Sequence, residues 1–297
     1  MKGSRLLLTA VVLVLLAALG YAVTVLPALG AGGLLHPGRR LAATPPPASC
    51  KNATFSGMGV TLKGWRCAPR GSRRGTLVYL HGVADNRASG SGVIQRFVRR
   101  GFEVIAYDSR AHGESDGAAC TYGYFEKDDL RQVLNQLAPG PVVLIGTSLG
   151  AAVALQTAAD DPRVSAIVAA EAFADLRTVA SERAPFFFTN GAIARAFALA
   201  EQRGGFVVDA VSAVRAAERI TAPVLLIHGE ADVDTPPLHS RRIFAALHGP
   251  KRLVLVPGAA HNGSLRGEIW NDIEGWIDES LASSRRTGDD DLPASRT

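Results

Sequence analysis

Apolar runs of strand length alternate with amphipathic stretches along most of this chain. The amphipathic stretches include GVIQRFVRR and YFEKDDLRQVLNQL, whose pattern is typical of surface helices. The apolar runs are nearly continuous and rich in β-branched residues, which is typical of strands buried on both faces. They cover residues 76–82, 102–108, 141–147, 164–170, 223–229 and 252–258. The alternation predicts an α/β domain with a mostly parallel central sheet and helices on both faces.

Two segments depart from this rhythm. Residues 53–59 and 60–69 (ATFSGMG and VTLKGWRCAP) predict a leading antiparallel pair of strands. Residues 172–217 contain no strand pattern and are helical and apolar, with PFFF at 185–188. An insertion of this size between two strands predicts a lid over the carboxyl ends of the sheet.

The N-terminus carries a long apolar run. Residues 6–26 contain no charge and match the roughly 20 residues that span a bilayer. Because the apolar core of a cleaved signal peptide is shorter, about 7 to 15 residues, the sequence favours a retained single-pass anchor within residues 1–35. Cleavage at Ala18-Leu19-Gly20 or Ala28-Leu29-Gly30, followed by secretion, is the alternative.

Basic residues flank the run almost equally, with Lys2 and Arg5 before it and Arg39 and Arg40 after it. The positive-inside count is therefore close to a tie. A short basic tail followed by an apolar run is typical of an export signal, so we expect the catalytic domain to lie outside the cytoplasm.

The rest of the chain divides into three parts. Residues 36–50 are rich in proline and small residues and predict an extended linker, residues 51–282 hold the folded domain, and residues 283–297 predict a disordered tail. Cys50 and Cys67 flank the predicted hairpin and would form a disulfide in an oxidising compartment, or remain reduced otherwise, whereas Cys120 is expected to be a free, buried thiol.

The net charge of +5 raises the question of an anionic partner. The basic residues are scattered, as at Arg73, Arg74, Arg99 and Arg100, and aromatic residues do not alternate with them. This pattern argues against nucleic-acid binding. It indicates an ordinary solvated surface, for which the only anionic partner we consider is nearby anionic lipid.

The chain contains the pattern Gly-x-Ser-x-Gly twice, at GTSLG with Ser148 and at GESDG with Ser115. A nucleophilic serine of this kind stands on a sharp turn that follows a strand directly and opens a helix. Ser148 meets this requirement, and Gly146 and Gly150 suit a strained turn that leaves no room for side chains. Ser115 lies several residues after its strand and opens no helix, so we expect it to be a structural residue.

A nucleophilic serine requires a histidine base, which in turn requires a carboxylate that orients it. Asp232 and His261 follow two later strands in the order that α/β-hydrolases use. Asp234 is the rival acid. We expect His239, which begins a helix after two prolines, to lie on the surface.

Acyl transfer also needs donors for the oxyanion. The backbone N–H of Leu149 is the first candidate, and that of Val83 in the loop LHGVADN is the second. Gly82 lets this backbone approach closely, and we expect His81 and Asn86 to brace the loop.

Five motifs, in this order, resemble the α/β-hydrolase superfamily and are most similar to its serine-aminopeptidase-like and monoacylglycerol-lipase-like branch, including membrane-anchored members. They are LHGVADNR (80–87), DSRAHGESDG (108–117), GTSLG (146–150), HGEADVDTP (228–236) and GAAHN (258–262). The resemblance covers about residues 51–281 and implies Ser148, Asp232 and His261 as the triad, with no metal or organic cofactor. It also accounts for GESDG as part of a family loop usually written D-x-R-G-H-G-x-S, in which Ala111 replaces a glycine.

The sequence therefore predicts a membrane-anchored serine hydrolase that acts on small-molecule or lipid-derived carboxylic esters through an acyl-enzyme. Amide or peptide hydrolysis is the alternative, since the same triad performs both, although Glu182 and Glu201 form no acidic cluster for a free amine. A non-catalytic binding protein with this fold is a further alternative. Haloalkane dehalogenases and epoxide hydrolases use a carboxylate nucleophile, which Ser148 excludes.

Overall fold

The computed structural model describes residues 2–290, with one 8-stranded sheet at its centre. The strand order is β1-β2-β4-β3-β5-β6-β7-β8. β1 pairs with β2, and β2 with β4, in antiparallel fashion, and the pairs from β4 to β8 are parallel. The strands are β1 (Cys50–Ser56), β2 (Thr61–Cys67), β3 (Gly75–Leu80), β4 (Phe102–Tyr107), β5 (Val142–Thr147), β6 (Val164–Ala170), β7 (Val224–Gly229) and β8 (Lys251–Val256).

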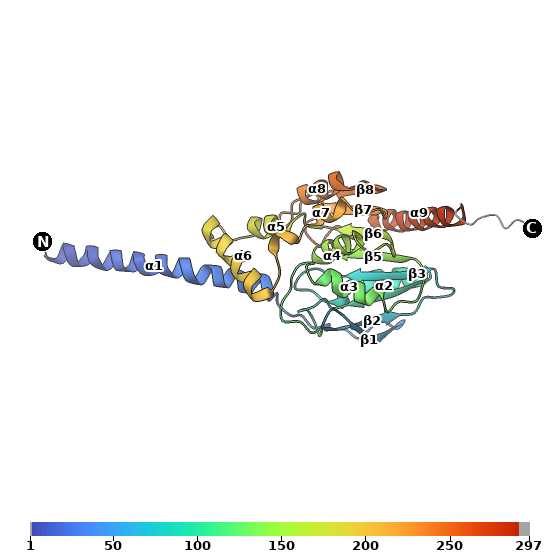
Figure 1. The fold of residues 1–297 in the computed structure, drawn as a ribbon, viewed down its shortest axis with the longest axis horizontal. Helices are drawn as coiled ribbons and strands as arrows, with labels where there is room; N and C mark the ends of the chain where they lie inside the picture. The colour runs from blue at the N-terminus through green and yellow to red at the C-terminus, as the bar shows by residue number, and fades with distance from the viewer. Residues whose placement is uncertain (1, 291–297) are drawn as a thin grey trace, which may run out of the picture.

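Helices cover both faces of this sheet (Figure 1). One face packs against α2 (Ser91–Arg99) and α9 (Ile269–Asp290). The other packs against α3 (Glu126–Leu134), α4 (Leu149–Ala158), α7 (Ala213–Ala217) and α8 (Leu238–Ala246). This is the α/β-hydrolase fold, and it confirms the predicted mostly parallel sheet and the leading antiparallel pair.

The inner strands are apolar because neither face meets water. Every residue of β3, β5 and β7 is buried, apart from the half-buried Thr147 at the end of β5. Each buried strand therefore shows a continuous apolar run in place of a polar alternation. The carboxyl ends of the parallel strands meet at one edge, and this edge positions the residues that follow them.

Between β6 and β7 the chain forms α5 (Leu176–Glu182), α6 (Asn190–Gly204), the short 3₁₀ helix η2 (Val208–Ala210) and α7. α5, α6 and η2 share a separate apolar cluster that includes Leu176, Phe197 and Val208, whereas α7 packs against the sheet. Two residues of the N-terminal helix, Ala31 and Leu35, are buried in the same cluster. The insertion and the end of that helix therefore pack together.

The N-terminal helix α1 (Lys2–Leu35) extends away from the domain and meets α6 with its carboxyl-terminal end (Figure 1). Residues Arg5–Leu35 are long and apolar enough to cross a membrane, with a mean hydropathy of 2.7. Pro27 lies inside the helix and cannot donate to the carbonyl of Val23, four residues earlier. Arg195 of α6 donates to that carbonyl instead, at 3.3 Å.

The segment after α1 lies against the domain. The Arg39 guanidinium donates to the carbonyls of Ser115 and Gly117 at 2.6 and 2.8 Å. The residues predicted as an extended linker thus make specific contacts with the loop that follows β4.

A disulfide joins Cys50 to Cys67 across β1 and β2, which is one of the two expected states of this pair, and Cys120 is free and buried, as expected.

The C-terminal end of the domain differs from the sequence expectation. The tail was expected to be disordered from residue 283, whereas α9 continues to Asp290. Residues 291–297 of that predicted tail lie outside the described part of the chain.

Candidate active site

Ser148 stands between β5 and α4 on a strained turn. Its backbone has φ of 50° and ψ of −110°, a conformation that side-chain-bearing residues rarely adopt. A Cβ on Gly146 would lie 2.4 Å from the Gly150 backbone, and one on Gly150 would lie 2.1 Å from the Leu80 carbonyl. Only glycine fits at these two positions, because the turn presses the start of α4 against β3 and β5.

His261 links Ser148 to Asp232 by hydrogen bonds. His261 Nε2 lies 3.1 Å from Ser148 Oγ, and Nδ1 lies 2.7 Å from Asp232 Oδ2. A carboxylate only accepts hydrogen bonds, so Nδ1 carries the proton and Nε2 accepts from the serine hydroxyl. This is the arrangement in which histidine can remove the serine proton.

Asp232 is buried and held in one orientation. Its Oδ1 accepts from the backbone N–H groups of Asp234 and Thr235 at 3.0 and 2.9 Å. Burial raises the pKa of Asp232, but hydrogen bonds from His228, His261 and the Thr235 amide outweigh this effect and hold the pKa well below its usual range. Asp232 is therefore an anion when it meets the imidazole.

Asp234 and Ser115, the two rival residues, occupy other positions. Asp234 is exposed. The carboxylate that accepts from His261 Nδ1 is that of Asp232, not that of Asp234. Ser115 is buried between strands, where its hydroxyl donates to the Asp108 carbonyl at 2.6 Å and accepts from the Lys63 amide at 2.8 Å. Ser115 connects β2 to the loop after β4.

The predicted oxyanion donors lie beside the serine. Leu149 is the first residue of α4, where N–H groups have no partner within the helix. Val83 and Gly82 line a cavity of about 720 Å³ together with Ser148 and His261. Two backbone donors on either side of a reacting carbonyl suit a tetrahedral oxyanion.

Two further predicted residues brace the Val83 loop. His81 is fully buried; its Nδ1 donates to the Gly82 carbonyl at 2.7 Å, and its Nε2 accepts from the Ser109 amide at 3.0 Å. Burial lowers the pKa of His81, which keeps the ring neutral for these two bonds. Asn86 caps the next helical turn, where its side chain accepts from the Ala88 amide at 2.9 Å.

Glu171 is a site residue that the sequence reasoning missed. It follows β6 directly, is 1% exposed and has a positive φ of 56°. Its carboxylate accepts from the backbone N–H groups of Asn262 and Ser264, and it lies 3.9 Å from His261 Nδ1. A signal was present, because Glu171 follows a predicted strand in the same way as Asp232 and His261 do.

The expectation for His239 was wrong. His239 lies in the first turn of α8, just after the two prolines, but it is 2% exposed and not a surface residue. Its Nδ1 accepts from the Ala174 amide at 3.1 Å, and its Nε2 lies 2.8 Å from Glu182 Oε2. The insertion between β6 and β7 folds over this face of α8 and covers the ring.

Glu171, Asp232 and His261 also bring three potential metal ligand atoms within 4.8 Å of one another. The carboxylates accept hydrogen bonds from backbone amides, and Nδ1 of the imidazole donates to Asp232. A metal ion at this point would have to replace these bonds. The donor set is thus fully used in orienting the histidine and its loop.

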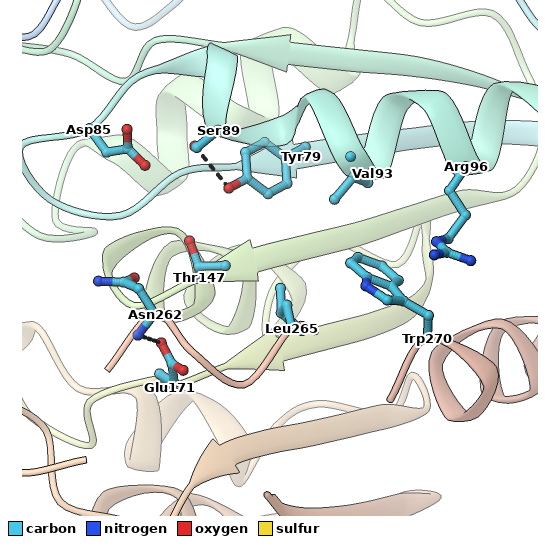
Figure 2. Close-up of a pocket in the computed structure, with 11 residues that line it drawn as sticks. Tyr79, Asp85, Ser89, Val93, Arg96, Thr147, Glu171, Asn262, Leu265 and Trp270 are labelled. Carbon is cyan, nitrogen blue, oxygen red and sulfur yellow. Dashed lines mark hydrogen bonds between the residues drawn. The ribbon is translucent and has the colours of Figure 1, made fainter. Parts of the chain in front are cut away.

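A second cavity, of about 300 Å³, lies behind the His261 loop (Figure 2). Asp85 and Asn262 line both cavities. Figure 2 shows the hydrogen bond between Glu171 and Asn262 on one side of this cavity. The Tyr79 hydroxyl lies on the other side, 3.0 Å from Ser89 Oγ. The Glu171–Asn262 contact therefore forms part of the wall between the two cavities.

Comparison of the sequence with known proteins gives the family of this chain. Residues 75–200 match the family model described as alpha/beta hydrolase fold. The chain is 30% identical over 216 residues to YqkD of Bacillus subtilis, a match that covers 69% of this chain and 70% of that protein. It is 35% identical over 89 residues to the sn-1-specific diacylglycerol lipase ABHD11 of Danio rerio, which covers 30% of this chain and 28% of that one.

The fold is also similar to that of a solved enzyme. The Pyrococcus furiosus esterase PF2001 superimposes with a TM-score of 0.66 at 20% identity, over 84% of this chain and 98% of that one. At this identity the likeness concerns the fold alone. Together with the extent of the match to YqkD, the family model establishes that the chain belongs to the α/β-hydrolase family.

Proposed function

We propose that this protein is a serine hydrolase that cleaves carboxylic esters, with Ser148 as nucleophile, His261 as base and Asp232 as the orienting acid. The hydrogen-bonded chain of 3.1 Å from Ser148 Oγ to His261 Nε2 and 2.7 Å from His261 Nδ1 to Asp232 carries the proposal. The similarity to an sn-1-specific diacylglycerol lipase over part of the chain supports an ester as substrate.

The proposed reaction has two halves. His261 Nε2 takes the Ser148 proton as Oγ attacks the ester carbonyl carbon, and the N–H groups of Val83 and Leu149 stabilise the oxyanion. The carbon–oxygen bond to the alcohol then breaks, and His261 returns the proton to the leaving oxygen. A water molecule then gives a proton to His261 and its hydroxyl to the acyl carbon. The bond from that carbon to Ser148 Oγ breaks, and His261 returns the proton to Oγ, which releases the acid and restores Ser148. Every proton is accounted for by residues of this chain.

A labelling experiment tests the nucleophile. We expect a fluorophosphonate probe to label the wild type and Ser115→Ala but not Ser148→Ala. The wild type and Ser115→Ala should also hydrolyse p-nitrophenyl esters, and Ser148→Ala should not. Ser115 makes a matched control because it lies in the other Gly-x-Ser-x-Gly match. Equal labelling of wild type and Ser148→Ala would exclude Ser148 as nucleophile.

Amide hydrolysis is a second candidate, because three carboxylates line the catalytic cavity. Asp85, Glu182 and Asp234 line it together with Arg40 and Arg183, and carboxylates of this kind suit a free amino group. Comparison of p-nitrophenyl acyl esters with aminoacyl p-nitroanilides separates the two functions. Substantial turnover of the anilides alone would replace the ester proposal. Binding of esters without turnover of either class would instead favour a non-catalytic role.

We further propose that α1 is a retained anchor and that the domain lies outside the cytoplasm. The Arg195 bond to the Val23 carbonyl supports retention, because Val23 precedes the second candidate cleavage site, Ala28-Leu29-Gly30, and would be lost on cleavage there. The Cys50–Cys67 disulfide supports an oxidising compartment. Protease treatment of intact cells, followed by mass measurement of the membrane-bound protein, tests both points.

A further inference from the structure

A third cavity, of about 320 Å³, lies between the end of α1 and the insertion over the active site. Its size falls in the range of small-ligand sites. The walls are mostly small or apolar and come from three segments of the chain. They are Gly30, Gly33 and Leu34 of α1, Tyr122, and Ala180, Arg183, Ala184, Pro185, Phe188, Ile193, Ala196 and Phe197 of the insertion.

The surface around this cavity is strongly apolar. Leu29 of α1 is 59% exposed, and Phe186 and Phe187 at the tip of the insertion are 99% and 53% exposed. Exposed aromatic and aliphatic groups in one patch mark a site of contact with a partner or a membrane. Because Leu29 belongs to the candidate membrane span, this patch is continuous with the surface that lipid would cover.

The cavity adjoins the catalytic cavity at Arg183, which lines both. Its guanidinium donates to the Asp234 carbonyl at 2.7 Å and to the Thr235 hydroxyl at 2.6 Å, and Nη2 lies 3.5 Å from His261 Nε2. A ligand that extends along the apolar cavity therefore meets a fixed cation beside the proposed base.

Specific contacts hold α1 against α6. Arg195 compensates the Val23 carbonyl that Pro27 leaves without a helical donor. A Cβ on Gly30 would lie 3.0 Å from both Ala196 Cβ and the Phe188 ring, so the absence of a side chain permits this close approach. The α1 wall of the cavity thus belongs to the folded domain.

We propose that this cavity binds the acyl chain of a lipid ester that enters from the membrane, so that α1 is both an anchor and one wall of the substrate site. The inference rests on the proposed esterase function and names its substrate class. The chain lies between α1 and α6, the ester carbonyl reaches Ser148, and the polar remainder occupies the larger, more polar catalytic cavity. An apolar chain fits the cavity because each methylene that leaves water there favours binding.

Two neighbouring glycines of α1 provide a matched test. Gly33 lines the cavity and Gly32 does not, and a Cβ at either position would meet no atom within 4 Å. Gly33→Trp should therefore fill the cavity, and Gly32→Trp should add the same side chain to the same helix without filling it. Both variants are prepared as the full chain in lipid nanodiscs.

We expect the kcat/KM of the wild type to rise from p-nitrophenyl acetate to the decanoate, by up to about fourfold for each methylene buried. Gly33→Trp should lower kcat/KM for the decanoate by about tenfold or more, the equivalent of about two methylenes, and leave the acetate within about twofold. Gly32→Trp should keep the wild-type profile. Identical profiles for the wild type and both variants would overturn the inference and leave the esterase function intact.

A binding measurement separates this inference from the chemistry. In the Ser148→Ala background, a fluorescent decanoate analogue should bind the Gly32→Trp protein as tightly as it binds the parent, and the Gly33→Trp protein about tenfold or more weakly. Equal binding to both tryptophan variants would refute the acyl site, whatever reaction Ser148 performs. If the wild type fails to turn over esters but the binding difference is present, only the esterase function fails.

Discussion

The carboxylate of Glu171 accepts a hydrogen bond from the backbone N–H of Asn262, the residue that follows the proposed base. A second bond, from the Ser264 amide at 3.1 Å, fixes the same loop. Glu171 thus holds the His261 loop from the end of β6, while Asp232 orients the imidazole from the end of β7. The proposed base is positioned by two carboxylates that follow two neighbouring strands.

Glu171→Gln should lower kcat by about 10- to 100-fold, because a small displacement of a catalytic group has an effect of this order. Glutamine keeps one acceptor oxygen but presents an NH₂ group to one of the two backbone donors. Steady-state kinetics with p-nitrophenyl butyrate measures the effect, with Glu279→Gln, an exposed carboxylate on α9, as control. Unchanged kcat in Glu171→Gln would show that the loop holds its position without this clamp.

Asp232→Asn should reduce kcat by about 10,000-fold, whereas Asp234→Asn should change it by no more than a few fold. The asparagine oxygen would keep the bonds from the Asp234 and Thr235 amides, so its NH₂ group would face His261 Nδ1 and donate to it, which favours the wrong tautomer. Fluorophosphonate labelling rates report the same loss without a chromogenic substrate. The reverse ranking of the two variants would identify Asp234 as the acid.

The depressed pKa of Asp232 predicts a pH dependence of stability. Its pKa in the folded state lies below its value in the unfolded chain, about 3.9, so the unfolded state takes up the proton first as the pH falls. The stabilisation is complete above about pH 4 and is lost as the pH falls toward the folded pKa. Urea unfolding from pH 7 to pH 3 should therefore show a steeper loss of stability in the wild type than in Asp232→Asn. Parallel curves would contradict this linkage.

Gly150→Ala should destabilise the protein by about 2 to 3 kcal/mol or prevent folding, because its Cβ would lie 2.1 Å from the Leu80 carbonyl. Gly191→Ala, in the first turn of α6, is the control, since the nearest atom to its Cβ would be 3.9 Å away. Alanine there should stabilise the helix by up to about 1 kcal/mol. Thermal unfolding of both variants measures the difference, and equal melting temperatures would mean that the turn can relax.

Reduction of the Cys50–Cys67 disulfide should cost about 3 kcal/mol, the loop-closure value for its separation of 17 residues. Urea unfolding with and without reductant measures this cost. The double variant Cys50→Ser, Cys67→Ser is the control, because reductant should not change its stability. Loss of less than about 1 kcal/mol on reduction would show that the hairpin needs no crosslink.

Cys120 should resist alkylation until the protein unfolds, because burial raises the pKa of its thiol well above the usual value.

The sequence alone determined the fold class and the residues at the carboxyl ends of the strands. Continuous apolar runs predict strands buried on both faces, and such strands in a parallel sheet bring the residues that follow them to one edge. Ser148, Asp232 and His261 could be selected for this reason. The two Gly-x-Ser-x-Gly matches were separated because Ser115 neither follows its strand directly nor opens a helix.

The tertiary structure decided the contacts between elements that are distant in sequence. Burial of His239 under the insertion, the clamp of Glu171 on the His261 loop, and the docking of α1 on α6 through Arg195 depend on how loops and helices pack. The local pattern of a segment records whether it is apolar, but it does not record which surface will cover it. The cavity between α1 and the insertion therefore exists only in the folded chain, because three separate segments supply its walls.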